Sequence, residues 1–463
     1  MRSTIRQTCM ISAFILLMGN LSAFAQDWPQ WRGQNRDAKV TGFTAPQKWP
    51  EKLTQKWKVT VGEGTDSTPA LVGDKLYVFT RKGGDEVLLC LNAGTGEEIW
   101  SDKYETPSVT GADQGHSGPR SSPSIADGKI CTLGVNGTLS CLDINTHKVL
   151  WRKNDFPGAL PRFHTAMSPV IVDNMCIGHF GNASDGAIVA YDLTTGEPKW
   201  KWSGGTGFGP SYASPVVATI GGTKQVIAQT EKNVVSLALA DGKLLWQVEA
   251  SGGRYAASSI VADEANSVVF GMKGNGCYAL KITKDGDAFK TEQLWNNEQI
   301  GAEYCTPVLL NGLLFGLTSR NDYYCLDAKT GTTDWSVSAN SNAAAEATNS
   351  NKIEIIPATY NGNTIITSAG FGGGRGGGMG GRGGRGGGMM GGGGGYAAIV
   401  EAGSVLFGLT SNAKLVVFEP SDKEYKQVAS YQVSDGQTYA YPIISGNRIF
   451  VSDQTSVTLW TIE

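Results

Sequence analysis

The sequence lacks the features that would point to a polyanion or a covalently held redox group. Its 39 Lys and Arg residues are nearly balanced by 42 Asp and Glu residues, and the formal net charge is -3. Both signs are mixed along the chain, so no extended basic surface is expected and nucleic-acid binding is not predicted. There is no Cys-x-x-Cys-His motif and no His-Glu-x-x-His motif. Covalent c-type haem and a zinc helix of that type are therefore not predicted.

Paired cysteines, long apolar runs and helical periodicity are also missing. Eight cysteines occur in the chain, and Cys9 lies near its start. The other seven are an odd number without Cys-x-x-Cys spacing, which argues against a disulfide framework. Beyond the first residues, no apolar run is long enough for a membrane helix, so no membrane span is expected. The absence of a 3.6-residue period favours an all-β fold.

The first residues have the pattern of a secretory signal peptide. Arg2 and Arg6 precede an apolar run at 10–18, and Ala23 and Ala25 form an Ala-x-Ala site. We therefore predict a signal peptide over 1–25, with cleavage after Ala25. The mature chain would begin with an N-terminal arm over 26–52 and would be periplasmic or secreted.

One phrase recurs along the mature chain. Its template is small-x-Asp-x-x-Thr-Gly-x-x-x-Trp, with clear copies at 90–100, 190–200 and 325–335, weaker copies at 141–151 and 236–246, and a longer one that ends at Trp295. The copies recur every 40–51 residues, which suits a four-stranded propeller blade. Each unit opens with Ser/Thr-Pro before an apolar run, and proline suits the first residue of a strand.

The repeats predict an eight-bladed β-propeller of four-stranded antiparallel blades over 53–463. Seven units follow the arm, and an eighth is divided between a strand at 56–61 and strands at 441–460. Pairing of these N- and C-terminal strands would close the ring and remove exposed sheet edges. The almost pure glycine segment 371–395 carries three arginines and resembles an RGG tract. We expect it to be a disordered insertion, because glycine offers no apolar surface to bury.

The recurring phrase resembles the tryptophan-docking motif of the pyrroloquinoline-quinone (PQQ) enzyme repeat superfamily, over nearly the whole mature chain. The segment Trp28-Pro-Gln-Trp-Arg-Gly-Gln-Asn-Arg-Asp37 is also similar to the opening of many PQQ-like propeller proteins. The resemblance implies an eight-bladed propeller. That superfamily includes quinoprotein alcohol dehydrogenases and non-enzymatic members, such as the propeller lipoprotein of the outer-membrane barrel-assembly machine. The motif therefore specifies a fold and not an activity.

The motif tryptophans are predicted to be structural wedges between blades, because the same ring recurs at one position in each unit. The small residue at the head of the motif would let the indole approach, and the Asp and Thr-Gly would form the turn. Cys90, Cys141 and Cys325 occupy that small position and are expected to be buried, compact apolar residues. The docking positions are Trp57, Trp100, Trp151, Trp200, Trp246, Trp295 and Trp335.

A candidate site follows from the residues that precede each Ser/Thr-Pro pair. They should lie where the innermost strands begin, around the propeller axis. Aromatic, cationic and acidic side chains that converge there could bind a ligand, or they could fill the channel as a hydrogen-bonded plug. No catalytic residue and no metal ligand is assigned. The candidate residues are Asp66, Arg120, His164, Tyr212, Arg254, Glu303, Tyr304 and Tyr439.

Two functions from different classes remain open. The resemblance implies that a PQQ- and calcium-dependent dehydrogenase of alcohols or sugars would place Arg120 or Arg254 beside the quinone and Glu303 or Asp66 at the metal. Such enzymes also cap the cofactor with a disulfide between adjacent cysteines and are longer, whereas this chain has no Cys-Cys pair. We therefore favour a non-catalytic, monomeric propeller without a cofactor that binds a protein, peptide or glycan of the cell envelope. The quinoprotein dehydrogenase is the alternative.

Overall fold

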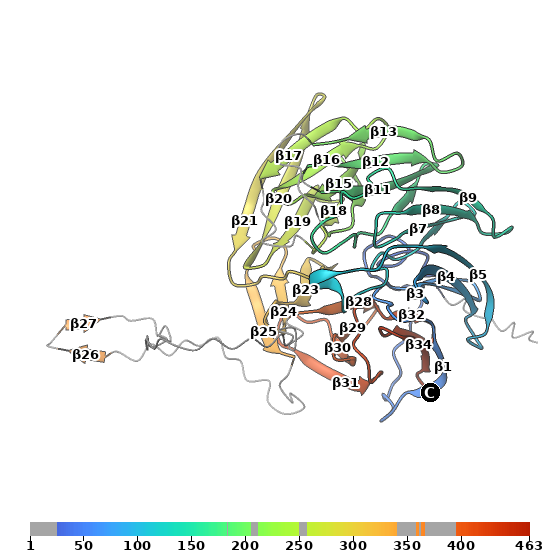
Figure 1. Cartoon of the computed structure of the whole chain (residues 1–463). Helices are drawn as coiled ribbons and strands as arrows, with labels where there is room; N and C mark the ends of the chain where they lie inside the picture. Colours follow the sequence, from blue (N-terminus) through green and yellow to red (C-terminus); the bar gives the residue numbers. More distant parts are fainter. Residues whose placement is uncertain are drawn as a thin grey trace, which may run out of the picture.

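The repeats fold into eight blades arranged in a ring. This computed structural model describes residues 26–182, 184–204, 212–249, 257–339, 358–360, 363–365 and 395–463. Within them the strands form eight four-stranded antiparallel sheets, which follow one another around the ring in chain order (Figure 1). The all-β, eight-bladed prediction is confirmed. The predicted signal peptide and, apart from Gly395, the predicted insertion 371–395 lie outside the described residues.

The first four blades run from blue to green in Figure 1. Blade 1 consists of β2 (Ala70–Val72), β3 (Lys75–Lys82), β4 (Asp85–Asn92) and β5 (Glu98–Glu105). After the 3-10 helix η1 (Gly111–Asp113), blade 2 consists of β6 (Ser124–Ala126), β7 (Lys129–Leu133), β8 (Leu139–Asp143) and β9 (Val149–Lys153). Blade 3 consists of β10 (Val170–Val172), β11 (Met175–Gly181), β12 (Gly186–Asp192) and β13 (Pro198–Trp202). Blade 4 consists of β14 (Val216–Ile220), β15 (Thr223–Gln229), β16 (Asn233–Ala238) and β17 (Leu244–Glu249).

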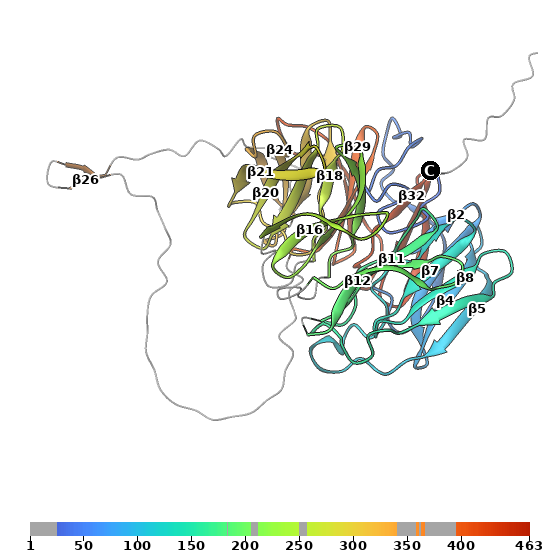
Figure 2. The ribbon, with the colours of Figure 1, turned by 90° about the horizontal axis from the view of Figure 1, so that it is seen from above.

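The other blades complete the ring. Blade 5 consists of β18 (Val261–Asp263), β19 (Val268–Lys273), β20 (Gly276–Asp285) and β21 (Ala288–Asn297). Blade 6 consists of β22 (Val308–Leu310), β23 (Leu313–Leu317), β24 (Asp322–Asp327) and β25 (Thr333–Ser338). Blade 7 consists of β28 (Ala397–Ala402), β29 (Val405–Thr410), β30 (Lys414–Glu419) and β31 (Lys426–Gln432). Blade 8 consists of β32 (Ile443–Ser445), β33 (Arg448–Ser452), β34 (Ser456–Thr461) and β1 (Thr54–Thr60). A separate two-stranded sheet, β26 (Ala358–Tyr360) and β27 (Asn363–Ile365), lies outside the blades (Figure 2).

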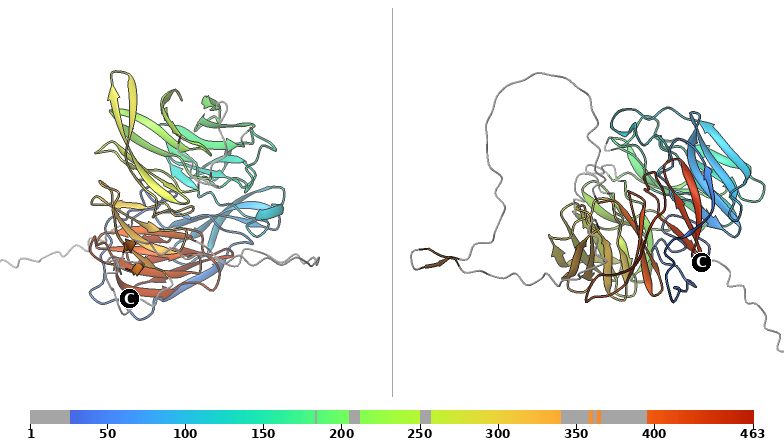
Figure 3. Two further views of the ribbon diagram at one scale, coloured as in Figure 1. Left: turned by 90° about the vertical axis from the view of Figure 1, so that its left-hand side faces the viewer. Right: turned by 90° about the horizontal axis from the view of Figure 1, so that it is seen from below.

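Blade 8 joins the two ends of the described chain. β1 pairs antiparallel with β34, from Thr54 opposite Thr461 to Thr60 opposite Ser456. The C-terminus therefore lies beside the blue N-terminal part of the chain (Figure 3). The predicted closure by terminal strands is confirmed. It converts an edge that would otherwise be open into a paired one.

The docking motif connects most blades to the next: the indole N–H donates to the following blade from Trp57, Trp151, Trp200, Trp295 and Trp335. Trp200 of blade 3 lies opposite the small residue Ala190 in its own sheet, and its indole N–H donates to the carbonyl of Leu239 in blade 4 at 2.9 Å. The motif glycine of blade 4, Gly242, has a φ of +71°, and a Cβ there would lie 2.6 Å from the Trp200 ring. Glycine is therefore required at this position for two reasons: the backbone conformation and the close approach of the ring. The predicted role as inter-blade wedge holds here.

Blade 2 shows what happens when the motif glycine is missing. His147 replaces it, keeps a positive φ of 61°, and stacks its ring on Trp100 at a centroid distance of 4.6 Å. Trp100 is only partly buried, and its indole N–H has no hydrogen-bond partner. The imidazole thus occupies the space into which the indole enters elsewhere. Among the docking tryptophans of the described residues, Trp100 alone has an indole N–H without a hydrogen-bond partner.

A belt of hydroxyl groups follows part of the ring around the axis, where the innermost strands begin. The Ser or Thr of the Ser/Thr-Pro pair accepts a hydrogen bond from the backbone N–H of the matching residue in the preceding blade. Thr68 N–H donates to Ser122 Oγ at 3.2 Å, Ser122 N–H to Ser168 Oγ at 3.0 Å, and Ser168 N–H to Ser214 Oγ at 2.9 Å. Proline follows most of these residues and has no N–H of its own. The Ser/Thr-Pro pattern is therefore an inter-blade link as well as the start of a strand.

The N-terminal arm crosses one end of the channel. Arg32 is 1% exposed, and its five guanidinium N–H groups match five acceptors, among them the carbonyls of Thr306 and Pro307, both at 2.8 Å, and the hydroxyl of Tyr441 at 2.9 Å. Arg36 reaches the carbonyls of Ser168 and Pro169 in blade 3. Burial, followed by the charge of Arg32, lowers the pKa of Arg36 to about 9.

The arm also joins the ends of the innermost strands on that face. Trp28 and Leu71 exchange two backbone hydrogen bonds, and the N–H of Val40 donates to the carbonyl of Glu401. Because Leu71 and Glu401 lie in β2 and β28, the arm links blades 1 and 7, which lie on either side of the closing blade 8. The arm therefore acts as a strap that closes one end of the axis.

The docking contacts give a first prediction. Trp200→Ala should lower the free energy of unfolding by about 3–5 kcal/mol, because it removes a buried indole and leaves a cavity. Trp100→Ala should cost clearly less, since its ring is partly exposed and its N–H is unbonded. Urea unfolding followed by tryptophan fluorescence measures both. Equal losses would contradict the ranking of the two contacts.

The strap gives a second prediction. Arg32→Met should destabilise the protein by about 3 kcal/mol or more, because it leaves several buried carbonyls without a donor. Arg36→Met should cost less, because Arg36 makes fewer hydrogen bonds and its buried Nε has no acceptor. Thermal unfolding by circular dichroism compares the two variants. A larger loss for Arg36→Met would show that the strap is held mainly at blade 3.

Candidate functional site

The candidate site lies at the end of the axis away from the strap. In a four-stranded antiparallel blade, the loop that leaves the outer strand reaches the next innermost strand on the same face each time. These loops surround the axis and hold most of the residues predicted for the site. We call the cluster formed by the following residues the axial mouth: Asp66, Asp113, His116, Arg120, Phe163, His164, Tyr212, Tyr304, Tyr396 and Tyr439.

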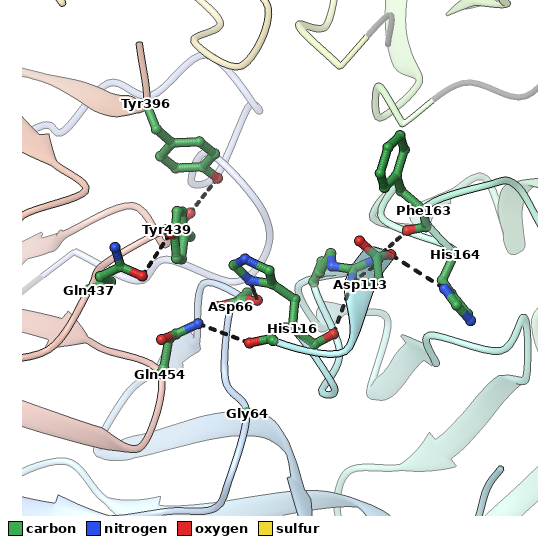
Figure 4. Close-up of polar contacts among 12 residues, drawn as sticks. Gly64, Asp66, Asp113, His116, Phe163, His164, Tyr396, Gln437, Tyr439 and Gln454 are labelled. Carbon is green, nitrogen blue, oxygen red and sulfur yellow. Dashed lines mark hydrogen bonds and ion pairs between the residues drawn. The ribbon is translucent and has the colours of Figure 1, made fainter. Parts of the chain in front are cut away.

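An acid–imidazole pair lies at the centre of Figure 4. Asp66 Oδ2 is 2.7 Å from His116 Nδ1, and the side chain of Asp66 is almost wholly buried. The hydrogen bond from Asp66 raises the pKa of His116 above its ordinary value of 6.5, although burial acts in the opposite direction. The other carboxylate oxygen, Oδ1, is buried and has no hydrogen-bond partner among the described residues. The pair thus keeps one unused acceptor.

A second cluster forms around Asp113. Its Oδ2 lies 2.9 Å from Arg120 Nη2 and 3.3 Å from His164 Nδ1. Arg120 also donates to the carbonyl of His116 at 2.9 Å and to the carbonyl of Phe163. The N–H of Phe163 in turn donates to the hydroxyl of Tyr212 at 3.2 Å. The guanidinium of Arg120 is therefore held by three acceptors from its own chain.

A row of rings follows the rim from blade 6 to blade 8. Tyr304 and Tyr396 are stacked at 6.0 Å between ring centroids, and Tyr396 meets Tyr439 edge to face at 4.9 Å. Tyr439 in turn meets the His116 ring at 5.1 Å. The hydroxyl of Tyr396 donates to the carbonyl of Tyr439 at 2.6 Å (Figure 4). Tyr304 remains 38% exposed at the outer end of the row.

Seven of the eight predicted site residues are described. Asp113 brings Arg120 and His164 together, and Phe163 adds Tyr212 to this group. Tyr396 connects Tyr304 with Tyr439, and His116 connects that row with Asp66.

Glu303 lies in the same loop as Tyr304 but takes no part in either cluster. Its N–H donates to Ser319 Oγ at 3.1 Å, and its carboxylate forms no ion pair within the described residues. Arg254 lies outside the described residues. Both interpretations of the mouth, a ligand site and a hydrogen-bonded plug, stay predictions.

Four residues that connect the predicted ones were missed, and one of them, Phe163, directly precedes the predicted His164. Asp113 and His116 lie within the long loop between β5 and β6, several residues before the Ser/Thr-Pro pair of blade 2. Tyr396 precedes β28, which has no Ser/Thr-Pro pair to mark its start. Selecting residues by their distance from each Ser/Thr-Pro pair therefore could not find them. The helix-like turn Gly111–Asp113 and the rare histidine beside it were the only local signals.

The described residues contain no metal-binding constellation. No group of three or more His, Cys, Asp or Glu side chains within them has an arrangement that could hold a metal ion. The seven described cysteines are all buried and unpaired. Over the same part of the chain, no helix is long and apolar enough to cross a membrane.

Comparison with known proteins gives two groups of relatives. A family model described as outer membrane protein assembly factor BamB matches residues 38–166 and 84–337. The chain is 22% identical over 250 residues to the outer membrane protein assembly factor BamB of Burkholderia pseudomallei, which covers 53% of this chain and 59% of that protein. It is 32% identical over 145 residues to the quinohemoprotein alcohol dehydrogenase ADH IIB of Pseudomonas putida, which covers 28% of this chain and 19% of that enzyme.

The matched segments span less than two thirds of the length of either relative. Among solved structures, the quinohemoprotein alcohol dehydrogenase of Comamonas testosteroni superposes with a TM-score of 0.61 at 13% identity. The superposition covers 94% of this chain and 80% of that one. At this identity the likeness concerns the fold alone.

The Asp66–His116 pair gives a third prediction, on pH. Because the pKa of folded His116 is raised above 6.5, the pair stabilises the fold fully below pH 6.5 and loses this contribution as the pH rises through the raised pKa. The thermal midpoint should therefore fall as the pH rises from about 6.5 through the raised pKa of His116, and His116→Gln should flatten this part of the profile. Differential scanning calorimetry at several pH values measures it. A wild-type midpoint that rises over this range with no change in His116→Gln would contradict the assignment.

Proposed function

We propose, on the premise that this chain belongs to the PQQ-repeat β-propeller family, that it is a non-catalytic binding or scaffold protein of the cell envelope. The observation that carries the proposal is the state of Arg120. A dehydrogenase of this fold needs a cation beside the quinone, but Arg120 is held by Asp113 and by two backbone carbonyls. Because the Arg120 guanidinium is already bonded to acceptors of its own chain, it is better suited to hold the rim of a binding site than to contact a quinone.

The proposed location and partner follow from the chain and its relatives. The predicted signal peptide supports export to the periplasm or beyond. The similarity to a protein named for the assembly of outer membrane proteins supports a protein partner. A rigid ring with loops gathered at one mouth suits such a partner, because the scaffold fixes the loop ends while the side chains meet the guest. We expect the protein to act as a monomer without a cofactor.

The alternative is a PQQ- and calcium-dependent dehydrogenase. One observation favours it: the mouth contains an acid–imidazole pair, Asp66 and His116, of the kind that can accept a proton. The rest of the described mouth does not fit the cofactor. Arg120 is occupied, no described group of side chains is arranged to hold a metal, and the sequence has no adjacent cysteines to cap a quinone. We therefore derive no catalytic step through PQQ.

A direct test uses the purified mature protein with PQQ and calcium. We expect neither retained quinone after gel filtration, measured by absorbance, nor reduction of an artificial dye acceptor with simple alcohols or sugars. Retained quinone without turnover would leave a binding protein with PQQ as its ligand. Turnover that disappears in Glu303→Gln or Arg120→Ala would overturn the proposal and establish the dehydrogenase.

A further inference from the structure

The two sides of the axial mouth differ in charge. Around Asp113, the guanidinium of Arg120 offsets the carboxylate, and the His164 ring lies beside it. The other side consists of Asp66 with the ring row Tyr304, Tyr396 and Tyr439, and we call it the acidic aromatic side. No described Lys or Arg side chain forms an ion pair or cation–π contact with Asp66, Tyr396 or Tyr439. Among the described residues, the group paired with the Asp66 carboxylate is the imidazole of His116.

The carboxylate of Asp66 is incompletely bonded. The residue is 7% exposed, Oδ2 is bonded to His116, and Oδ1 is buried without a partner. A buried carboxylate oxygen without a hydrogen-bond donor is costly, so such oxygens normally have partners in folded proteins. The missing partner must carry an N–H or O–H.

The adjacent rings favour a positive charge near the same place. Aromatic faces carry partial negative charge, and a cation within about 6 Å of a ring centroid is attracted to it. The pKa of Tyr439 is raised by burial and then by the charge of Asp66, so the field of the carboxylate reaches this ring. Glu303, next in sequence to Tyr304, adds a second carboxylate to the same loop. A cation beside Asp66 would meet a carboxylate and aromatic rings together.

We propose that the acidic aromatic side binds a protonated amine of the ligand, such as a lysine-type ammonium of a partner chain. The inference rests on the proposed binding function and specifies the chemistry of its guest. The ammonium would donate to Asp66 Oδ1 and lie against the rings of Tyr439 and Tyr396. A neutral hydroxyl could also donate to Oδ1, but it would use neither the charge of the carboxylate nor the ring faces. An anion would be repelled.

His116 makes this binding dependent on pH. Four groups act on its imidazole: Asp66 and Asp113 with negative charge, Arg120 with positive charge, and the Tyr439 ring edge to face. When His116 is protonated, it neutralises Asp66 and competes with an incoming ammonium. Amine binding should therefore strengthen as the pH rises above the range where His116 is charged.

The test compares two probes that differ only in charge. Cadaverine carries an ammonium at each end of a five-carbon chain, and 1,5-pentanediol, with a hydroxyl at each end, is its neutral counterpart. By isothermal titration calorimetry with the full mature protein, we expect cadaverine to bind at least about tenfold more tightly than the diol. Asp66→Asn should weaken cadaverine binding by about tenfold or more, while Asp85→Asn, which removes a surface carboxylate paired with Lys103, should not change it.

Further variants keep the test decisive if Asp66→Asn unfolds. Tyr439→Phe keeps the ring and should bind cadaverine normally, whereas Tyr439→Leu should bind it several-fold less tightly. Equal binding of the two probes, no cadaverine binding up to about 10 mM, or unchanged binding in Asp66→Asn or Tyr439→Leu would overturn the inference. If a neutral glycan or peptide bound at the mouth instead, the amine inference would fail and the binding function would stand. Quinone-dependent turnover would refute the proposed binding function itself.

Discussion

The insertion of a tryptophan from one blade into the motif turn of the next is the contact on which the ring depends. At Trp200 it combines a hydrogen bond to the carbonyl of Leu239 with contact to Gly242, whose missing Cβ makes room for the indole. A blade alone would expose both faces of a four-stranded sheet, so each depends on its neighbours for burial. Pairing of β1 with β34 extends the same dependence around the full circle. Where His147 replaces the glycine, the contact survives as ring stacking but loses its hydrogen bond.

Once the blades are fixed, the two ends of the axis take different roles. At one end the arm inserts Arg32, whose donors are all bonded, and thereby links blade 6 and blade 8 to the arm's own backbone. At the other end the loops carry side chains that are bonded to one another across blades, as Arg120 is to Asp113 and Phe163. The belt of Ser and Thr hydroxyls separates these ends. The strap therefore occupies one end of the axis and the candidate site the other.

The sequence predicted the fold well because its signal is periodic. A phrase that recurs every 40–51 residues specifies blade size, blade number and the role of the tryptophans together. The site was predicted only in part. The rule that counts back from Ser/Thr-Pro found Asp66, Arg120 and Tyr439, but it could not find Asp113 or His116. Their positions depend on the path of a long loop around η1, and no repeat constrains that path. Contacts between blades, such as Tyr439 with His116, are likewise set by ring closure and not by neighbouring residues.

The contrast between Arg120 and Asp66 explains how one fold can serve different functions. Both residues occupy equivalent positions before an innermost strand, and both are charged. Arg120 has found its acceptors within the chain, so it contributes rigidity to the rim. Asp66 keeps one oxygen unbonded beside aromatic rings, so its free energy would be lowered by a donor that the described residues do not supply. In a propeller, the repeat determines where such positions lie, and the identity of the residue at each position determines whether it supports the ring or binds a guest.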